Sequence, residues 1–120
     1  MTVRRVKTYT AQTGFVYEYY FVGKRAALDN DPFAPATEFI FDVSSDRKTI
    51  FAVSVFLLPR ALEVFSAERG RTLSDPEQYA AAKLRLLQSF DEFPNMLQDG
   101  RRLTLDSETL VALLESVGIE

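Results

Sequence analysis

The sequence has no cysteine and no histidine among its 120 residues. These absences exclude disulfides, thiol nucleophiles, metal sites built on thiolate or imidazole, and catalytic triads that use histidine. Any acid–base chemistry would fall to Asp, Glu, Tyr or Lys. No stretch approaches the roughly 18 apolar residues of a membrane-spanning helix, and the basic N-terminus lacks the apolar segment of a secretory signal. We therefore expect a cytoplasmic protein with no membrane partner and no cofactor.

The sequence also lacks a strong excess of either charge. The formal net charge is −3, and neither half of the chain is basic enough to indicate a nucleic-acid partner. With 47% hydrophobic and 26% charged residues, the composition is that of an ordinary globular protein. A chain of this length can build one hydrophobic core but not two. We expect residues 1–120 to form a single domain.

The first half of the sequence predicts β-strands, because eleven of the fifteen aromatic residues lie within the first 56 positions. Residues 3–10 predict an edge strand whose basic side chains discourage pairing with another chain; an anion-binding strip is the alternative. Residues 15–22 predict a strand with Phe15, Tyr17, Tyr19 and Phe21 on one face. Residues 23–37 contain two prolines and predict a long loop, although part of this stretch, residues 24–29, could extend the strand before it.

Residues 38–44 and 49–58 predict a β-hairpin around a polar turn. The second run is apolar on both alternating sets of side chains, which is typical of a strand in the middle of a sheet with both faces covered. A loop of three or five residues would place Phe39, Phe41 and Val43 opposite Val55, Val53 and Phe51. We favour this register because it collects the large apolar side chains on one face.

The second half predicts helices. A short helix over residues 60–69 ends at Gly70, and the box Ser74-Asp-Pro-Glu77 begins a longer amphipathic helix that Pro94 ends. A short strand follows at 101–105, and a last helix carries a buried stripe of Leu110, Leu113, Leu114 and Val117. The order β-β-β-β-α-α-β-α predicts an α+β fold: an antiparallel sheet of four to five strands, packed by two to three C-terminal helices.

The predicted register also defines a candidate site on the second face of the sheet. Four polar residues would gather there, namely Glu18, Tyr20, Asp42 and Ser54. They would lie on an apolar floor formed by Val16, Val22, Ile40 and Phe56. These eight residues are the site prediction.

Three functions are compatible with such a face. The first is a small binding or assembly module, in which the face holds a small-molecule ligand or closes a homodimer. The second is a cofactor-independent enzyme in which Glu18 or Asp42, desolvated on the apolar floor, acts as general acid or base and Tyr20 donates a hydrogen bond. The third is single-stranded RNA binding by stacking on Tyr17, Tyr19 or Phe21, against which the acidic composition argues. The binding module is our leading hypothesis.

Overall fold

A computed structural model describes residues 5–120 of the chain. The five strands are β1 (Lys7–Thr10), β2 (Val16–Ala26), β3 (Thr37–Ser44), β4 (Phe51–Leu57) and β5 (Arg102–Leu105). The four helices are α1 (Pro59–Arg69), α2 (Asp75–Glu92), α3 (Met96–Asp99) and α4 (Ser107–Ser116). The expected α+β fold is confirmed. Among residues 5–120, no helix combines the length and the apolar character needed to cross a bilayer.

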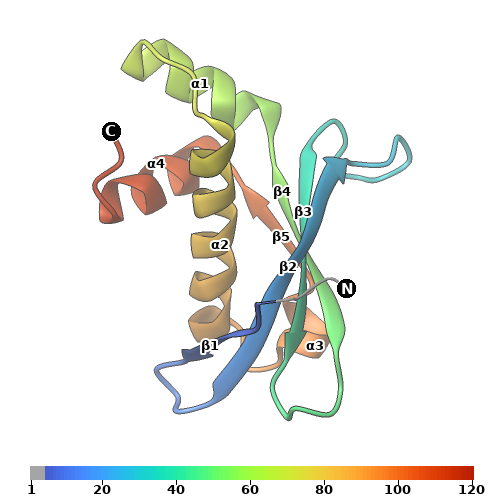
Figure 1. Cartoon of the computed structure of the whole chain (residues 1–120). Helices are drawn as coiled ribbons and strands as arrows, with labels where there is room; N and C mark the ends of the chain where they lie inside the picture. Colours follow the sequence, from blue (N-terminus) through green and yellow to red (C-terminus); the bar gives the residue numbers. More distant parts are fainter. Residues whose placement is uncertain (1–4) are drawn as a thin grey trace.

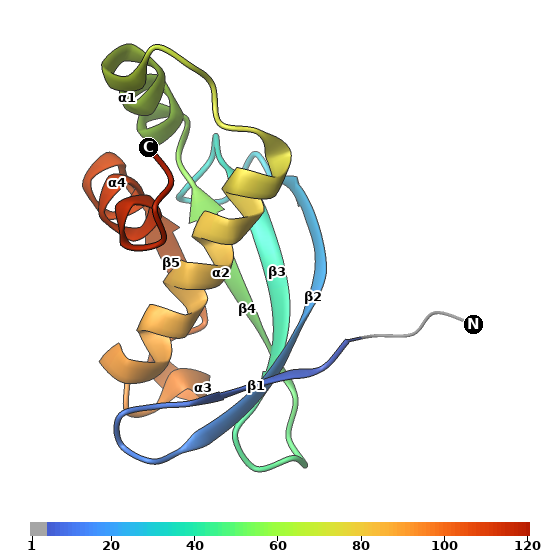
Figure 2. The same cartoon turned by 60° about the vertical axis from the view of Figure 1, so that its left-hand side comes forward.

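The sheet has the strand order β1-β2-β3-β4-β5. The first four strands form an antiparallel meander, whereas β5 pairs with β4 in parallel. The expected antiparallel sheet is confirmed for the first four strands, and the parallel β4–β5 pair is an addition to it. The parallel pair arises because three helices connect β4 to β5 and return the chain to the end of the sheet where β4 began. Helix α2 lies along one face of the sheet, with α1 and α4 on the same side (Figure 1, Figure 2).

The favoured register of the central hairpin is confirmed. Phe39, Phe41 and Val43 lie opposite Val55, Val53 and Phe51, and all six side chains are buried on the helix side of the sheet. Asp42 and Ile40 consequently point to the other face, opposite Ala52 and Ser54. The apolar pattern was sufficient to choose the register because a shift of one residue would have exposed the largest side chains of the sheet.

A β-bulge interrupts the pairing of β2 with β3. Phe21 pairs with Phe41, but the next paired residue is Gly23, opposite Ile40, so Val22 is the additional residue. Beyond the bulge the alternation of β2 is reversed, which places Arg25 opposite Glu38. The strand continues to Ala26, as the alternative extension into residues 24–29 anticipated in part.

The long helix begins at the predicted capping box. The Ser74 hydroxyl accepts from the Glu77 amide, and the Glu77 carboxylate accepts from the Ser74 amide. Gly70 ends α1 in the left-handed conformation, with φ of 69°. One helix was missed: after Pro94, Asn95 caps the single turn of α3, whose Met96 is buried. A four-residue helix has too few residues to show an apolar period in the sequence.

Three further details correct the sequence-based expectations. The first strand begins at Lys7, so Arg5 and Val6 precede it, and positions 3 and 4 lie outside the described residues. Phe15 precedes β2 and is 58% exposed, and Val117 follows α4 and is 51% exposed. Phe15 lies before the strand begins, and Val117 lies after the helix has ended. The alternation of the strand and the period of the helix therefore do not direct these two side chains into the core.

The core lies between α2 and the sheet, and Phe90 is at its centre. The Phe90 ring stacks on Tyr17 with a centroid separation of 4.2 Å and an interplanar angle of 4°. It also contacts Tyr9 and Tyr19, at 5.8 and 6.1 Å. One side chain of α2 therefore joins the helix to both β1 and β2. The burial of Tyr17 and Tyr19 here removes them from any surface on which an RNA base could stack.

Candidate functional site

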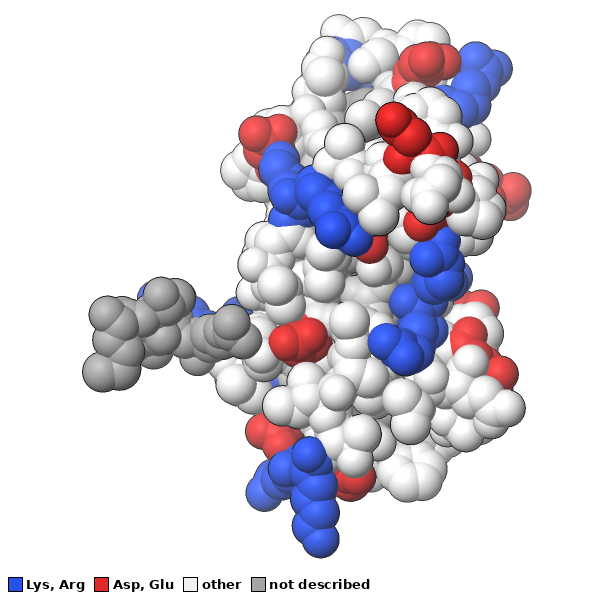
Figure 3. All heavy atoms as spheres, turned by 90° about the vertical axis from the view of Figure 1, so that its right-hand side faces the viewer, with Lys and Arg blue, Asp and Glu red and all other residues white. Residues whose placement is uncertain are grey.

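The sheet face opposite the helices carries the predicted site residues. Within residues 5–120 the helices lie on the other side of the sheet (Figure 1, Figure 2), and the space-filling view shows separate groups of basic and acidic side chains among uncharged ones on this face (Figure 3). Part of it is covered by the loop between β2 and β3. Phe33 of that loop packs on Phe56, with ring centroids 5.1 Å apart, and Arg102 of β5 lies over both rings.

The open part of this face contains a pocket of about 170 Å³. Its lining includes three of the predicted polar residues, Glu18, Tyr20 and Asp42, each from the middle of β2 or β3. Their strand positions bring them together, because Tyr20 lies directly opposite Asp42 and Glu18 opposite Ser44. Val6 and Ile50 add exposed apolar walls.

Two polar contacts organise the pocket. The Tyr20 hydroxyl donates to Asp42 Oδ2 at 2.6 Å. The guanidinium Nε of Arg47 lies 3.1 Å from the Glu18 carboxylate. No Lys or Arg within residues 5–120 forms an ion pair with Asp42. Among the described residues, the pocket therefore carries two carboxylates against one guanidinium, an excess of one negative charge.

The turn of the central hairpin fixes Arg47 at the pocket. Arg47 has a left-handed backbone with φ of 63°, and its amide donates to the Ser44 hydroxyl at 2.9 Å. Asp46 accepts from the amides of Lys48 and Thr49, both at 2.8 Å. These backbone donors, first Thr49 and then Lys48, lower the pKa of Asp46. The turn is thus held by its own hydrogen bonds and presents Arg47 to Glu18.

The fourth polar candidate, Ser54, lies in a different cluster on the same face. Its hydroxyl donates to Glu38 Oε2 at 2.6 Å, and Arg25 Nε donates to Glu38 Oε1 at 2.9 Å. Glu38 is only 6% exposed, so these two donors satisfy a buried carboxylate. The sequence contained no indication of this triad, because it depends on the bulge that turns Arg25 to this face.

The four apolar candidates differ in accessibility. Val16 and Val22 are exposed, and Ile40 is half-buried. Phe56 lies on the predicted face but is fully buried beneath Phe33 and Arg102. Residues 5–120 therefore cover the end of the face near Phe56 and leave the end near Asp42 open.

The cover over Phe56 is held by an ion pair. Arg102 donates to Asp31 Oδ1 at 2.6 Å, and the Phe33 amide donates to the same oxygen at 2.9 Å. The Arg102 hydrogen bond, followed by that of the Phe33 amide, lowers the pKa of Asp31. Asp31 thus links the β2–β3 loop to β5.

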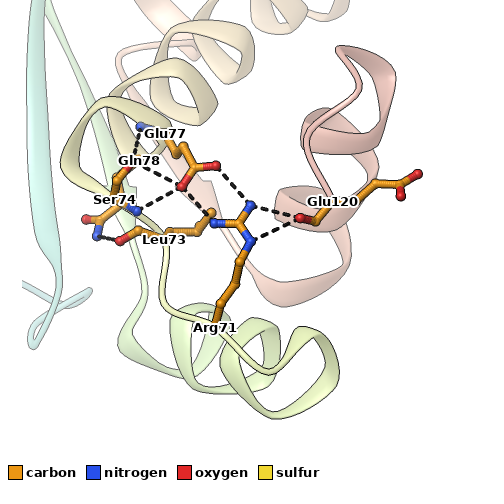
Figure 4. Close-up of polar contacts among 6 residues, drawn as sticks. All are labelled: Arg71, Leu73, Ser74, Glu77, Gln78 and Glu120. Carbon is orange, nitrogen blue, oxygen red and sulfur yellow. Dashed lines mark hydrogen bonds and ion pairs between the residues drawn. The ribbon is translucent and has the colours of Figure 1, made fainter.

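A further polar cluster lies away from the sheet. The Arg71 guanidinium donates to both carboxylate oxygens of Glu77, each at 2.9 Å, and to the backbone oxygen of Glu120 (Figure 4). The hydrogen bond from Arg71 and then that from the Ser74 amide lower the pKa of Glu77 to about 2. The Arg71 guanidinium and the Glu77 carboxylate are thus paired with each other. The cluster joins the start of α2 to the C-terminal residues.

The described part of the chain holds no group of three His, Cys, Asp or Glu side chains suited to a metal ion. The fold and the open pocket define a small α+β protein in which residues 5–120 cover the second sheet face only in part. Comparison with protein families, with curated proteins and with solved structures finds no match to this chain. Its function must therefore be argued from the site.

Proposed function

We propose that this protein is a binding module that holds a small ligand in the pocket formed by Glu18, Tyr20 and Asp42. The observation that carries the proposal is that the pocket lies on the open part of the sheet and contains a carboxylate with no cationic partner among residues 5–120. A half-buried carboxylate gains most from a ligand that brings a positive charge or hydrogen-bond donors.

The size of the pocket limits the ligand. Its volume of about 170 Å³ is smaller than the roughly 300 Å³ at which pockets for drug-sized ligands begin. It fits a compact group, such as a protonated amine, whose apolar part contacts Val6 and Ile50. Tyr20 holds Asp42 in a fixed position, so the Asp42 side chain loses little conformational entropy when the ligand binds.

The test is an NMR titration with benzylamine, using benzyl alcohol as the uncharged comparison. We expect shifts of the Asp42 and Tyr20 amides with the amine and weaker binding of the alcohol. Asp42→Asn keeps the shape and removes the charge, so it should weaken amine binding by about tenfold or more. Asp29→Asn, at an exposed loop position, is the matched control. Equal affinity of the Asp42 variant and the wild type would refute the proposal.

A homodimer through the same face is the second candidate. Three exposed apolar residues favour it: Val6, Val16 and Ile50 are 53%, 43% and 61% exposed. Light scattering over a concentration series tests the candidate, with Ile50→Ser as the variant that should weaken association. Phe56 is unsuitable for this purpose because it is already buried within one chain. A monomer at every concentration would rule out the dimer and leave the small-ligand proposal unchanged.

An acid–base role for Glu18 or Asp42 and a cytoplasmic location remain predictions from the sequence. The acid–base hypothesis requires that one of these carboxylates contacts a bound molecule. The amine titration tests that access directly, since a ligand that contacts Asp42 would shift its side-chain resonances.

A further inference from the structure

Strand β1 runs beside α2, and one of its ends is firmly attached to the helix. The Tyr9 hydroxyl donates to Asp91 Oδ2 at 2.6 Å, and the Gln12 amide donates to Asp91 Oδ1 at 2.7 Å. The Tyr9 hydrogen bond and then the Gln12 amide lower the pKa of Asp91. This contact sets the position of β1 along the helix.

The other end of β1 brings two lysines together. Side chains two residues apart on a strand share a face, so Lys7 points to the helix side as Tyr9 does, and it lies opposite the buried Tyr19. On α2, Lys83 lies eight residues before Asp91, close to two helical turns. Burial, followed by the neighbouring Lys7 ammonium, lowers the pKa of Lys83. Two like charges therefore face each other across the interface between strand and helix.

No carboxylate of the surrounding elements neutralises this pair. The acidic residues of α2 all have other partners: Asp75 with Lys24, Glu77 with Arg71, Asp91 with Tyr9 and Gln12, and Glu92 with Arg85. Glu18 of β2 pairs with Arg47. The first twelve residues of the sequence contain no Asp or Glu. Within residues 5–120, Arg5, Lys7 and Lys83 form no ion pair.

A pocket of about 270 Å³ lies at this end of β1. Arg5 and Lys7 line it together with aromatic residues of β2 and α2, namely Tyr19, Tyr20, Phe21 and Tyr79. Phe21 and Tyr79 meet edge to face, with centroids 4.8 Å apart. The pocket opens where β1 stops covering β2, because the pairing of the two strands ends at Lys7 and Tyr19. It thus combines uncompensated positive charge with flat apolar walls.

We propose that this pocket binds a small molecule that carries a phosphate group on an aromatic ring. The phosphate lies between Arg5 and Lys7, the two cations that line the pocket, where it accepts charge-assisted hydrogen bonds from both. The ring lies against Phe21 and Tyr79. The pocket adjoins the one that contains Asp42, with which it shares Tyr19 and Tyr20, and it prefers the opposite charge. A long nucleic acid is a poorer fit, since the basic group is small and the chain carries a net charge of −3.

The test compares phenyl phosphate, inorganic phosphate and benzoate by isothermal titration calorimetry at constant ionic strength. We expect phenyl phosphate to bind more tightly than either of the others, by about tenfold. Equal affinity for inorganic and phenyl phosphate would refute the claim that an aromatic ring binds in the pocket. Tighter binding of benzoate would refute the claim that the pocket prefers a phosphate group. Absence of binding by all three at millimolar concentration, or salt-sensitive binding of an oligonucleotide in their place, would overturn the proposal as a whole.

Lys7→Met is the decisive variant, with Lys48→Met in the exposed hairpin turn as its matched control. Removing the Lys7 ammonium should weaken phenyl phosphate binding by about tenfold or more. Because it also removes the repulsion with Lys83, the free variant should melt at the same or a higher temperature than the wild type. Retained binding in a folded Lys7 variant refutes the assignment. Arg5→Met gives a second, independent loss if Lys7→Met folds poorly.

Discussion

Replacing Phe90 with alanine should remove a large part of the stability of the fold. Phe90 is 2% exposed and its ring stacks on Tyr17 at 4.2 Å, with two more tyrosine rings within 6.1 Å. Truncating a buried Phe costs about 3–5 kcal/mol, and aromatic contacts add about 0.5–1.5 kcal/mol. The partner rings are held by the backbone of β1 and β2, so the cavity cannot collapse easily. We expect a loss of about 4–5 kcal/mol.

That loss is a large fraction of the roughly 5–15 kcal/mol that stabilises a domain of this size. Urea unfolding followed by circular dichroism measures it. With a slope of about 2 kcal/mol/M, the midpoint should fall by about 2 M. If Phe90→Ala does not fold, Phe90→Leu keeps most of the volume and should cost about 1.5 kcal/mol.

Phe15→Ala is the control for Phe90→Ala, because it removes the same ring from a position that is 58% exposed. It should change the free energy of unfolding by less than about 0.5 kcal/mol. The packing argument would be refuted if the two alanine variants lost equal stability, or if Phe90→Ala lost less than about 1 kcal/mol.

Two other substitutions test separate contacts. The Glu77 carboxylate, whose pKa is lowered from 4.5 to about 2, stabilises the fold above its unfolded-state pKa and loses this effect as the pH falls through the folded-state value. Glu77→Gln should therefore reduce the loss of stability between about pH 4.5 and 2 in urea titrations, and an unchanged pH profile would contradict the assignment. Phe33→Ala should uncover Phe56 and cost about 1–2 kcal/mol, whereas an unchanged urea midpoint would show that the loop contributes no cover.

The central hairpin and the long helix were predictable because local sequence determines them. The register follows from the alternation of Phe39, Phe41 and Val43, since a shift of one residue would expose them. The start of α2 follows from the reciprocal hydrogen bonds of Ser74 and Glu77, two residues only three positions apart. The neighbourhood of Glu18, Tyr20 and Asp42 then follows from the same register.

Other features depend on contacts between distant residues and were missed. The bulge at Val22 reverses the faces of β2, and nothing in the alternation of that strand indicated it. The pairing of Arg25 with Glu38 is a consequence of the bulge. The approach of Lys7 to Lys83 depends on where β1 docks along α2, which in turn depends on Asp91. A single sequence contains no signal for such a long-range alignment.

The attachment of β1 to Asp91 has a consequence for the order in which the molecule is assembled. The hydrogen bond between Tyr9 and Asp91 joins residues 82 positions apart, and β5, which completes the sheet, lies further along the chain. During synthesis from the N-terminus, the first strand cannot reach its place until α2 has left the ribosome. Until then, the aromatic side chains of β1 and β2 remain without their helical cover. This is the interval in which a nascent chain is most exposed to association with others.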